Sequence, residues 1–504
     1  MYEFLDPRFK GRNLAPLNIV SYDTYELGAR DAIAITFKDL DTDQIYVETI
    51  EKPKYEVYIL KKEYWDEATF MAPWESMNKL DRKLISYHWR DRELAQILNC
   101  DPNYVKTSPL IFGYDIKIEH YYWIQFLLNY GTDAAKTINM GLFDIESDII
   151  QCDGFAAPGE APTSAITFVD ASKKTVYTLV LGKDNLPILA LSNPHYAETE
   201  KIKANFYEQV DAVRNNLNGL VAECHEMFDE YYGSDLTYNI MLVDDEIKLH
   251  QVFWEIIRRS NIDYLGAWNA PYDIRNLIER PLALGYEPES IITDPAFKYR
   301  TCFFEEDDNI EVHKRNHRSA ISIKPTMICM MWMYAGVRAA KGKPDSLKLN
   351  AVAKKELKDE KLNYEEEGDI RTFMYKNFRK FILYNIKDVL LLFGLHRVTR
   401  DIDNVYDRCY TNGMLIPEAF VSTTMLTTSM TKYFLQEGFV IGTNANRILP
   451  PFDWVNYIAA DKKTLNSLNQ LAEEAESFDP DAYYEMAEEE SLNEGSFEEG
   501  SDNT

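Results

Sequence analysis

The chain has 504 residues, of which 46% are hydrophobic and 13% aromatic, so it is long enough for two or three domains with sizeable cores. Its formal net charge of −28 argues against extended electrostatic binding of nucleic acid, because lysine and arginine are needed to neutralise phosphates. Residues 471–504 carry 13 acidic residues and no basic ones, so this tail is predicted to be disordered. The rest is still acidic, so any nucleic-acid contact must be local or assisted by a metal or a partner.

The six cysteines are scattered, and no two form a Cys-x-x-Cys pair, which favours reduced thiols over disulfides or a zinc site. The N-terminus lacks the basic start and apolar core of a signal peptide. No apolar run approaches the roughly 20 residues of a membrane span. These features predict a soluble, cytoplasmic protein with no membrane partner.

Residues 1–133 are expected to form an N-terminal domain of mixed α/β structure. Ile33, Ile35 and Phe37 alternate with small or polar residues, and a second alternating run begins at Tyr55. One antiparallel sheet is the simplest interpretation. Between about residues 63 and 100 the pattern becomes helical and irregular.

Residues 134–403 are expected to form an α/β domain with a mixed sheet flanked by helices. The predicted elements are a strand at 143–146, antiparallel neighbours at 165–169 and 176–181, a helix capped near Asp244 and Asp245, a buried strand at 262–268, and a helix at about 378–397. Residues 404–450 are predicted to be helix and connecting loop, and residues 451–504 a linker and acidic tail.

Carboxylates stand out at three places in this second region. Asp144 and Glu146 are two apart on a predicted strand, so they lie on one face and repel each other unless a cation lies between them. Asp273 follows the strand 262–268, at the sheet edge where α/β proteins bind ligands. Tyr384 and Asp388 are four apart on the last helix and share a face.

Together, Asp144-x-Glu146, Asn269-x-x-Tyr272-Asp273 and Tyr384-x-x-x-Asp388 resemble the three exonuclease motifs of the DEDD class with a tyrosine in the third motif. Their contexts resemble family B DNA polymerases of T-even-like bacteriophages. Matching stretches are 265–269, 345–349 and 384–389, and the resemblance covers about residues 1–450. It implies an RNase H-like exonuclease domain, and it makes 404–450 a return segment of the N-terminal domain.

The resemblance implies 3′–5′ hydrolysis of a DNA end by a two-metal mechanism. The residues Asp144, Glu146, Asp273 and Asp388 would hold two Mg²⁺ or Mn²⁺ ions. Tyr384 would orient the attacking water, and Asn269 would hold the terminal nucleotide or brace Asp273. Tyr272 belongs to the same motif and is a further candidate for contacting the substrate.

The polymerase palm of the family is missing, since the sequence contains none of its D-x-x-S-L-Y-P, K-x-x-x-N-S-x-Y-G and Y-G-D-T-D-S motifs. The chain therefore resembles the proofreading part of a split polymerase, with DNA, a separate palm chain, a sliding clamp and a single-strand-binding protein as implied partners. Two alternatives are a freestanding exonuclease and a DNA-binding scaffold subunit with a silent nuclease. The intact four carboxylates disfavour the scaffold, and the return segment disfavours the freestanding enzyme.

Residues 313–318 form the densest basic run in the chain. Lys314, Arg315 and Arg318 are either a solvated loop or phosphate contacts, in the place where relatives carry a hairpin that parts primer from template. Asp148 and Asp153 lie near the first motif and are expected to be solvated loop carboxylates.

Overall fold

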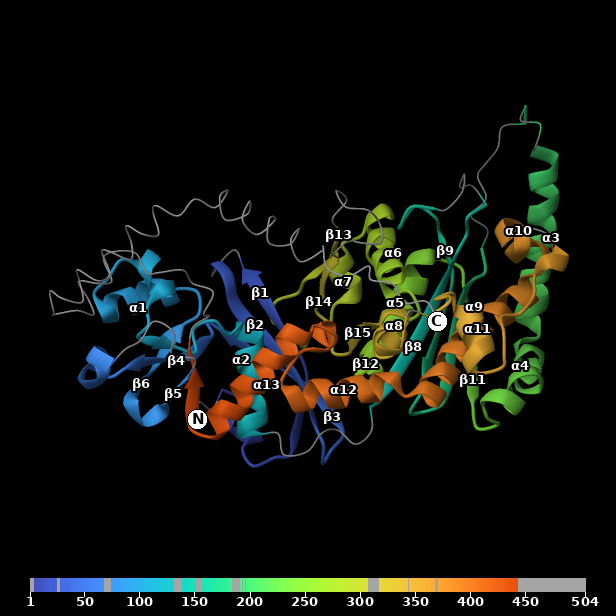
Figure 1. Ribbon diagram of the computed structural model, residues 1–504. Coiled ribbons are helices and arrows are strands. Elements are labelled where there is room, and N and C mark those ends of the chain that lie inside the picture. Colours follow the sequence, from blue (N-terminus) through green and yellow to red (C-terminus); the bar gives the residue numbers. More distant parts are fainter. Residues whose placement is uncertain are drawn as a thin grey trace, which may run out of the picture. The chain divides into compact units, whose positions relative to one another are not determined.

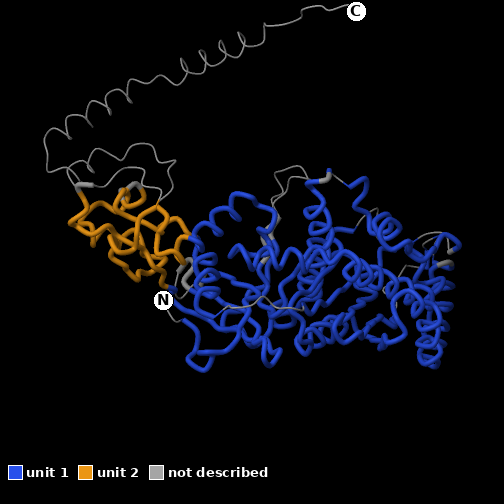
Figure 2. Tube along the Cα trace, turned by 60° about the horizontal axis from the view of Figure 1, so that its bottom comes forward, with its two compact units in different colours: residues 1–53, 117–433 blue, residues 54–116, 434–504 orange. Residues whose placement is uncertain are grey.

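The computed structural model describes residues 4–24, 28–67, 74–130, 138–150, 156–183, 191–192, 194, 196–306, 317–342, 344–367 and 370–442. The chain divides into two compact units (Figure 2). Unit 1 comprises residues 1–53 and 117–433, and unit 2 comprises residues 54–116 and 434–504. Residues 1–53 therefore cluster with the later part of the chain, and the unit boundaries differ from the predicted ones at 133 and 403.

The fold is mixed α/β, with α1–α13 among the described residues. The strands of unit 1 are β1 (Leu14–Thr24), β2 (Gly28–Asp39), β3 (Gln44–Glu51), β8 (Met140–Ser147), β9 (Thr163–Asp170), β10 (Thr175–Leu181), β11 (Thr237–Val243), β12 (Tyr264–Ala267), β13 (Cys302–Glu306), β14 (His317–Ile321) and β15 (Thr326–Cys329). The helices assigned with it are α2 (Ile118–Asn129), α3 (Tyr196–Asn215), α4 (Leu217–Tyr232), α5 (Glu246–Arg259), α6 (Ala270–Ala283), α7 (Pro288–Ile292), α8 (Met330–Arg338), α9 (Leu349–Glu356), α10 (Ile370–Lys376), α11 (Phe378–Thr399), α12 (Asp401–Asn412) and α13 (Ser422–Gln436).

A six-stranded mixed sheet is the centre of unit 1, with the order β11-β10-β9-β8-β12-β15. Strand β8 pairs antiparallel with β9 and parallel with β12. Strand β10 pairs with β9, so the second predicted neighbour of β8 is one strand removed from it. In Figure 1 these strands lie between a group containing α5 and α6 and a group containing α3, α4 and α11.

Each face of β8 packs differently. Phe143 and Ile145 enter an apolar core that includes Phe253 of α5 and Leu277 of α6. The alternation of a strand sends Asp144 and Glu146 to the other face, which α11 covers. The core thus fixes which side of the sheet receives the carboxylates.

The three-stranded antiparallel sheet β1-β2-β3 also belongs to unit 1. Its strand β2 carries Lys38, which is almost fully buried and donates a hydrogen bond of 3.1 Å to the buried carboxylate of Asp263. Asp263 immediately precedes β12 and also accepts a hydrogen bond from the backbone of Asn139, just before β8. This ion pair joins the N-terminal sheet to the starts of the two strands that lead to the carboxylates.

Unit 2 contains the remaining elements, namely β4 (Lys54–Leu60), β5 (Trp74–Ser76), β6 (Leu80–Ser86), α1 (Arg90–Leu98), β7 (Ile111–Phe112) and β16 (Phe439–Ile441). Strand β4 lies between β6 and β7, so the two alternating N-terminal runs belong to separate sheets and not to one. Strand β6 was not predicted, since its burial does not alternate. Strand β16 pairs with β5, so a segment after residue 403 returns to pair with N-terminal residues.

No helix among the described residues is long and apolar enough to cross a bilayer. Five cysteines fall in the described part of the chain, and all five are free thiols there. Cys152 lies outside the described residues. No disulfide joins those five, and their redox state stays a prediction.

Candidate metal centre

Two of the predicted ligands lie on β8, next to its pairing with β9. Asp144 is opposite Thr167 and Glu146 is opposite Ala165 in the antiparallel register. On its other edge, β8 pairs with β12 only as far as Leu142. The end of β8 that carries both carboxylates therefore has no partner strand on that side among the described residues, which leaves it accessible to other side chains.

The helix α11 supplies Tyr384 and Asp388, both of them buried. Nearly every residue from 378 to 396 is buried, so this helix lacks the separate polar face that its sequence predicts. The reason is that α11 is packed on several sides, by β8 and β9 and by α3, α4, α9 and α10. Its tyrosine and aspartate face into the protein, toward the carboxylates of β8.

The structure brings Asp144, Glu146 and Asp388 together. One carboxylate oxygen of each lies within 4.8 Å of the others, close enough for the three to hold a metal ion. The oxygen Oδ1 of Asp388 is buried and has no hydrogen-bond partner among the described residues. Carboxylate oxygens are the ligands of hard divalent cations, and an unpartnered buried oxygen is one that a cation would satisfy. The donor set therefore fits such an ion.

Asp273 is not a member of this close group, although it is buried beside it. It lies in the first turn of α6, and after burial and the charges of Asp144 and Asp388 its own charge also raises the pKa of Glu146. Two turns later, Arg280 donates hydrogen bonds of 2.7 and 2.9 Å to both carboxylate oxygens of Glu246 on α5. This paired contact fixes α6 against α5, and with it the position of Asp273.

The crowding of these groups shifts their proton affinities. Burial and the charge of Asp388 together raise the pKa of Asp144 from 3.8 to about 7, although the charge of Lys361 opposes them. Burial and neighbouring carboxylates also raise the pKa of Glu146 and of Asp273. Like charges in a poorly solvated site favour the protonated form. The site is thus short of positive charge, and binding a cation would relieve this.

A lysine of the chain lies at this site, although no motif in the sequence predicted it. Lys361, in the segment after α9, places its ammonium nitrogen 2.5 Å from Oδ2 of Asp388 and 3.4 Å from the hydroxyl of Tyr384. Burial opposes the charged form, but the surrounding carboxylates outweigh it and raise the pKa of Lys361. The Lys361 ammonium balances one of the negative charges of the site. Its role follows only from the residues that surround it in the fold, not from any pattern in the sequence.

A second ion pair lies beside the first, and here α11 supplies the lysine while the segment after α9 supplies the carboxylate. Lys387, the residue before Asp388, contacts Asp359 at 2.6 Å, while Lys361 contacts Asp388. Asp359 also accepts a hydrogen bond of 2.6 Å from Tyr232. Asp359 and Lys361, in the segment after α9, are therefore held by consecutive residues of α11. These two ion pairs fix the position of the Lys361 ammonium.

Asn385 connects the two β-strands to α11. Its Oδ1 accepts a hydrogen bond of 2.5 Å from Thr167 on β9, and its Nδ2 lies 3.4 Å from Oδ2 of Asp144. Asn385 is completely buried. Because Thr167 is opposite Asp144 in the sheet, the three side chains form a short polar chain that orients the aspartate.

The other predicted site residues have mixed positions. Asn269 is exposed at the start of α6, and its carbonyl accepts the amide hydrogen bond of Asp273. Tyr272 is 37% exposed and does not line the groove described below. Lys314 and Arg315 lie outside the described residues, and Arg318 is described only as a backbone position of β14. Strands β13 and β14, on either side of the basic run, pair antiparallel.

Asp148 is not a solvated loop carboxylate, so that prediction was wrong. It is buried and accepts hydrogen bonds from the hydroxyl of Tyr375 and the backbone of Ile150. The cause is that α10 brings Tyr375 to the end of β8, a contact that local sequence does not reveal. Asp153 lies outside the described residues.

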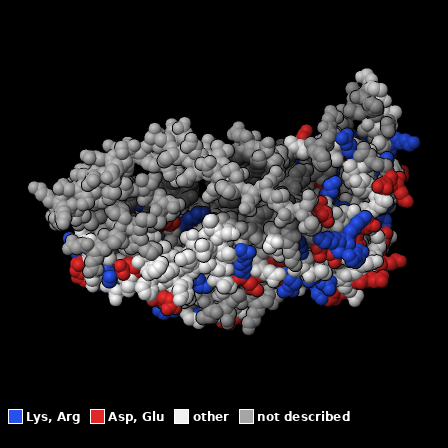
Figure 3. All heavy atoms as spheres, in the orientation of Figure 1, with Lys and Arg blue, Asp and Glu red and all other residues white. Residues whose placement is uncertain are grey.

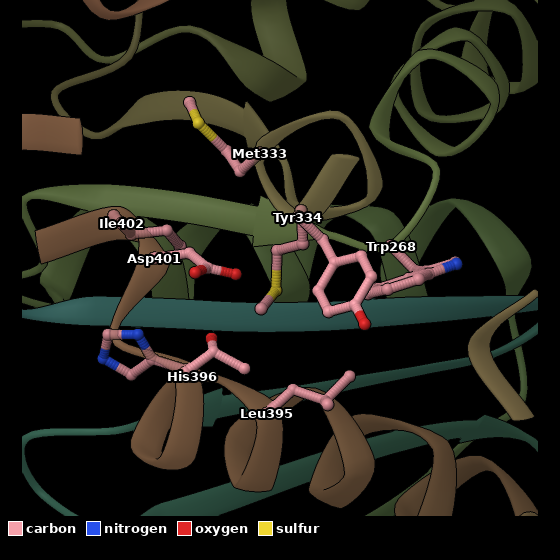
Figure 4. Close-up of a pocket in the computed structure, with 9 residues that line it drawn as sticks. Trp268, Met333, Tyr334, Leu395, His396, Asp401 and Ile402 are labelled. Carbon is pink, nitrogen blue, oxygen red and sulfur yellow. The ribbon is translucent and has the colours of Figure 1, made fainter. Parts of the chain in front are cut away.

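A groove of about 1480 Å³ adjoins the carboxylates. Lys361, Tyr384 and Asn269 line it, and it extends to α4 and to residues 346–350. Figure 3 shows basic side chains, with acidic ones beside them, over the region where Figure 1 labels α9 and α11. By contrast, a cavity near Trp268, Tyr334 and residues of α11 and α12 measures about 10 Å³ (Figure 4), enough for one water molecule at most.

Comparison with known proteins gives no relative, because no family model matches the chain and no curated protein matches it.

Proposed function

We propose that unit 1 is a 3′–5′ exonuclease that hydrolyses phosphodiester bonds at the end of a single-stranded DNA, with an RNase H-like fold of the DEDD class. The observation that carries this proposal is the group of three carboxylates from β8 and α11 within 4.8 Å of one another, with a buried unpartnered oxygen on Asp388. The large groove beside the group gives a polymer access to it.

Each residue of the site has a distinct role in this proposal. Asp144, Glu146 and Asp388 would hold divalent ions, Mg²⁺ or Mn²⁺, with Asp273 completing the set for a second ion. When bound, such ions supply Lewis acidity toward water and toward the phosphate oxygens. The chain itself contributes orientation, because Asn385 holds Asp144 and the paired segments hold Lys361.

Tyr384 and Lys361 would supply hydrogen-bond donors to the reacting phosphate. The hydroxyl of Tyr384 lies 3.4 Å from the Lys361 ammonium, which can donate to it. Burial, together with the charges of Asp388 and Glu146, raises the pKa of Tyr384, so its hydroxyl keeps its proton at neutral pH. A neutral hydroxyl beside a fixed ammonium can orient a water molecule and donate to a phosphate oxygen.

The wider proposal is that this chain is the proofreading part of a phage-type family B polymerase whose palm belongs to another chain. It rests on the order and spacing of the three motifs. DNA, the palm chain, a sliding clamp and a single-strand-binding protein are the partners that go with it. This chain alone should then incorporate no nucleotides, and measurable primer extension would refute the split.

The test is release of nucleoside monophosphates from a 3′-labelled oligonucleotide by the purified chain, with Mg²⁺ or Mn²⁺. We expect the double variant Asp144→Ala, Glu146→Ala to abolish release. The matched control is Asp170→Ala, which removes a buried carboxylate of the same sheet that accepts hydrogen bonds from Ser172 and Lys173 and lies outside the group. No release with either metal, including after addition of the palm chain, would refute the catalytic proposal.

A further inference from the structure

The groove is too large to serve only the reacting phosphate. Its volume of about 1480 Å³ exceeds the 300–1,000 Å³ typical of a pocket for one small molecule. It is continuous with the carboxylate site through Tyr384 and Lys361, and it reaches Met227, Phe228 and Tyr231 on α4. A groove that starts at a hydrolytic site and continues past it suits a segment of a polymer.

Most of the positive charge in this groove is already paired. Of its four lysines, Lys354 contacts Glu360, Lys361 contacts Asp388, and Lys387 contacts Asp359. Within the part of the chain that the structure describes, Lys348 is the groove lysine without a carboxylate partner, and it is exposed. The groove can therefore neutralise few phosphates, and charge alone cannot supply its affinity.

Aromatic surface is available in the groove in place of charge. Tyr231 is 63% exposed, although the Lys387 ammonium lies over its ring at 5.6 Å from the ring centre. Lys387 forms an ion pair with Asp359, and its ammonium lies 5.1 Å from the ring centre of Tyr232. One face of Tyr231 is thus supported by a buried cation and the remaining surface is open, which is the arrangement of a stacking platform.

We propose that Tyr231, with Met227 beside it on α4, is a subsite for an unpaired base of a single-stranded polynucleotide, and that Lys348 contacts a phosphate of the same strand. This inference rests on the proposed function, because it assigns the substrate of that site. A base inside a duplex has both faces covered by its stacked neighbours, so the subsite selects unpaired strands. Stacking on aromatic rings tolerates any base sequence, as a proofreading or degrading enzyme requires.

The test measures binding without hydrolysis, in EDTA, using the full chain. Two fluorescein-labelled probes of equal length are compared: a dT decamer and a decamer whose four central nucleotides are abasic. We expect the wild type to bind the dT decamer about tenfold more tightly, and Tyr231→Ala to lose most of that preference. Tyr231→Phe should keep it. Tyr286→Ala is the matched control, since Tyr286 is 44% exposed but does not line the groove.

Lys348 is tested by salt dependence with the same dT probe. Each phosphate contact to a single strand contributes about 0.7 to the slope of log K against log salt. We expect Lys348→Ala to reduce that slope by about this amount without changing the preference for bases. An unchanged slope would remove Lys348 from the subsite.

The subsite is overturned if the wild type shows no preference between the probes, or if Tyr231→Ala keeps the preference seen for Tyr286→Ala. Neither result depends on metal or catalysis. A chain that binds unpaired bases through Tyr231 but releases no monophosphates, even after addition of the palm chain, would refute the proposed function and leave the subsite standing. If the chain hydrolyses DNA but Tyr231→Ala does not change the preference for the dT decamer, the subsite is refuted and the proposed function stands.

Discussion

Replacing Asp144 by asparagine should make the metal-free protein more stable while abolishing hydrolysis. The reason is that Asp144, Glu146 and Asp388 are held within 4.8 Å of one another, and Lys361 neutralises only part of their charge. Sites built for function commonly keep such unfavourable arrangements at the expense of stability. The variant keeps the shape of the side chain and removes one of the repelling charges.

The size of the effect follows from the pKa of Asp144, which burial and the charge of Asp388 raise from 3.8 to about 7. Each tenfold change in proton affinity is 1.36 kcal/mol, so the ionised carboxylate costs the fold roughly 4 kcal/mol. Asp144 keeps some solvent exposure, which screens part of this cost, and asparagine is itself a buried polar group. We therefore expect a gain of about 2 kcal/mol in the free energy of unfolding, or roughly 4 °C in Tm.

The gain should depend on pH in a defined direction. A folded-state pKa above the ordinary value means that the stability from this group is fully present below pH 3.8 and is lost as the pH rises through about 7. The wild type and Asp144→Asn should therefore be nearly equal in stability at pH 4 and differ most above pH 7. Urea unfolding in EDTA across this range measures the difference.

Adding Mn²⁺ should reverse the order of stability. A ligand present at 100 times its Kd stabilises the folded state by about 2.7 kcal/mol, and the variant has lost one of the ligands. Asp170→Asn is the control, because this buried carboxylate has hydrogen-bond partners at 2.8 and 3.0 Å and should lose stability equally with and without metal. If Asp144→Asn is less stable than the wild type in EDTA at pH 8, the reasoning from charge crowding is wrong.

Three further predictions concern neighbouring contacts. Lys361→Met leaves Asp388 without its ion-pair partner, so we expect a loss of about 3 kcal/mol in metal-free urea unfolding and a large fall in kcat, with Lys361→Arg partly restoring both. Asn385→Leu should lower kcat about tenfold with an unchanged Kd for the dT decamer in EDTA; a changed Kd would contradict a purely orienting role. Although burial opposes it, hydrogen bonds from His120 and Lys117 lower the pKa of Glu418 to about 2. The stability it contributes should be lost as pH falls from 4.5 through 2, so unfolding curves of Glu418→Gln and the wild type should differ at pH 5 and converge near pH 2.

The parts of the fold that sequence could predict are those governed by local periodicity. The alternation in 143–146 predicted a strand with two carboxylates on one face, and β8 has that arrangement. Asp245 was a predicted cap and accepts the amide hydrogen bond of Ile247 at the start of α5. The partition into units could not be predicted, because the buried pair of Lys38 and Asp263 joins residues 225 positions apart.

The same distinction applies to the site. Asp144, Glu146 and Asp388 stand at recognisable spacings on a strand and a helix, and the structure brings them together. Lys361 lies in a segment with no regular structure, where neither spacing nor periodicity predicts which way a side chain points. Asp148 continues the alternation of Asp144 and Glu146, yet its partner is Tyr375, which a separate helix supplies.

The paired charges at Asp359, Lys361, Lys387 and Asp388 connect the two proposals of catalysis and binding. Lys387 supports the Tyr231 ring on one side and holds Asp359 on the other, while its neighbour Asp388 reaches the carboxylate group and holds Lys361. The ion pairs Lys387–Asp359 and Lys361–Asp388 would therefore transmit a displacement of α4 to the segment that carries Lys361. If a base stacks on Tyr231, the same contact that retains the strand also fixes the cation beside Asp388, so unpaired ends would be both bound and cut preferentially.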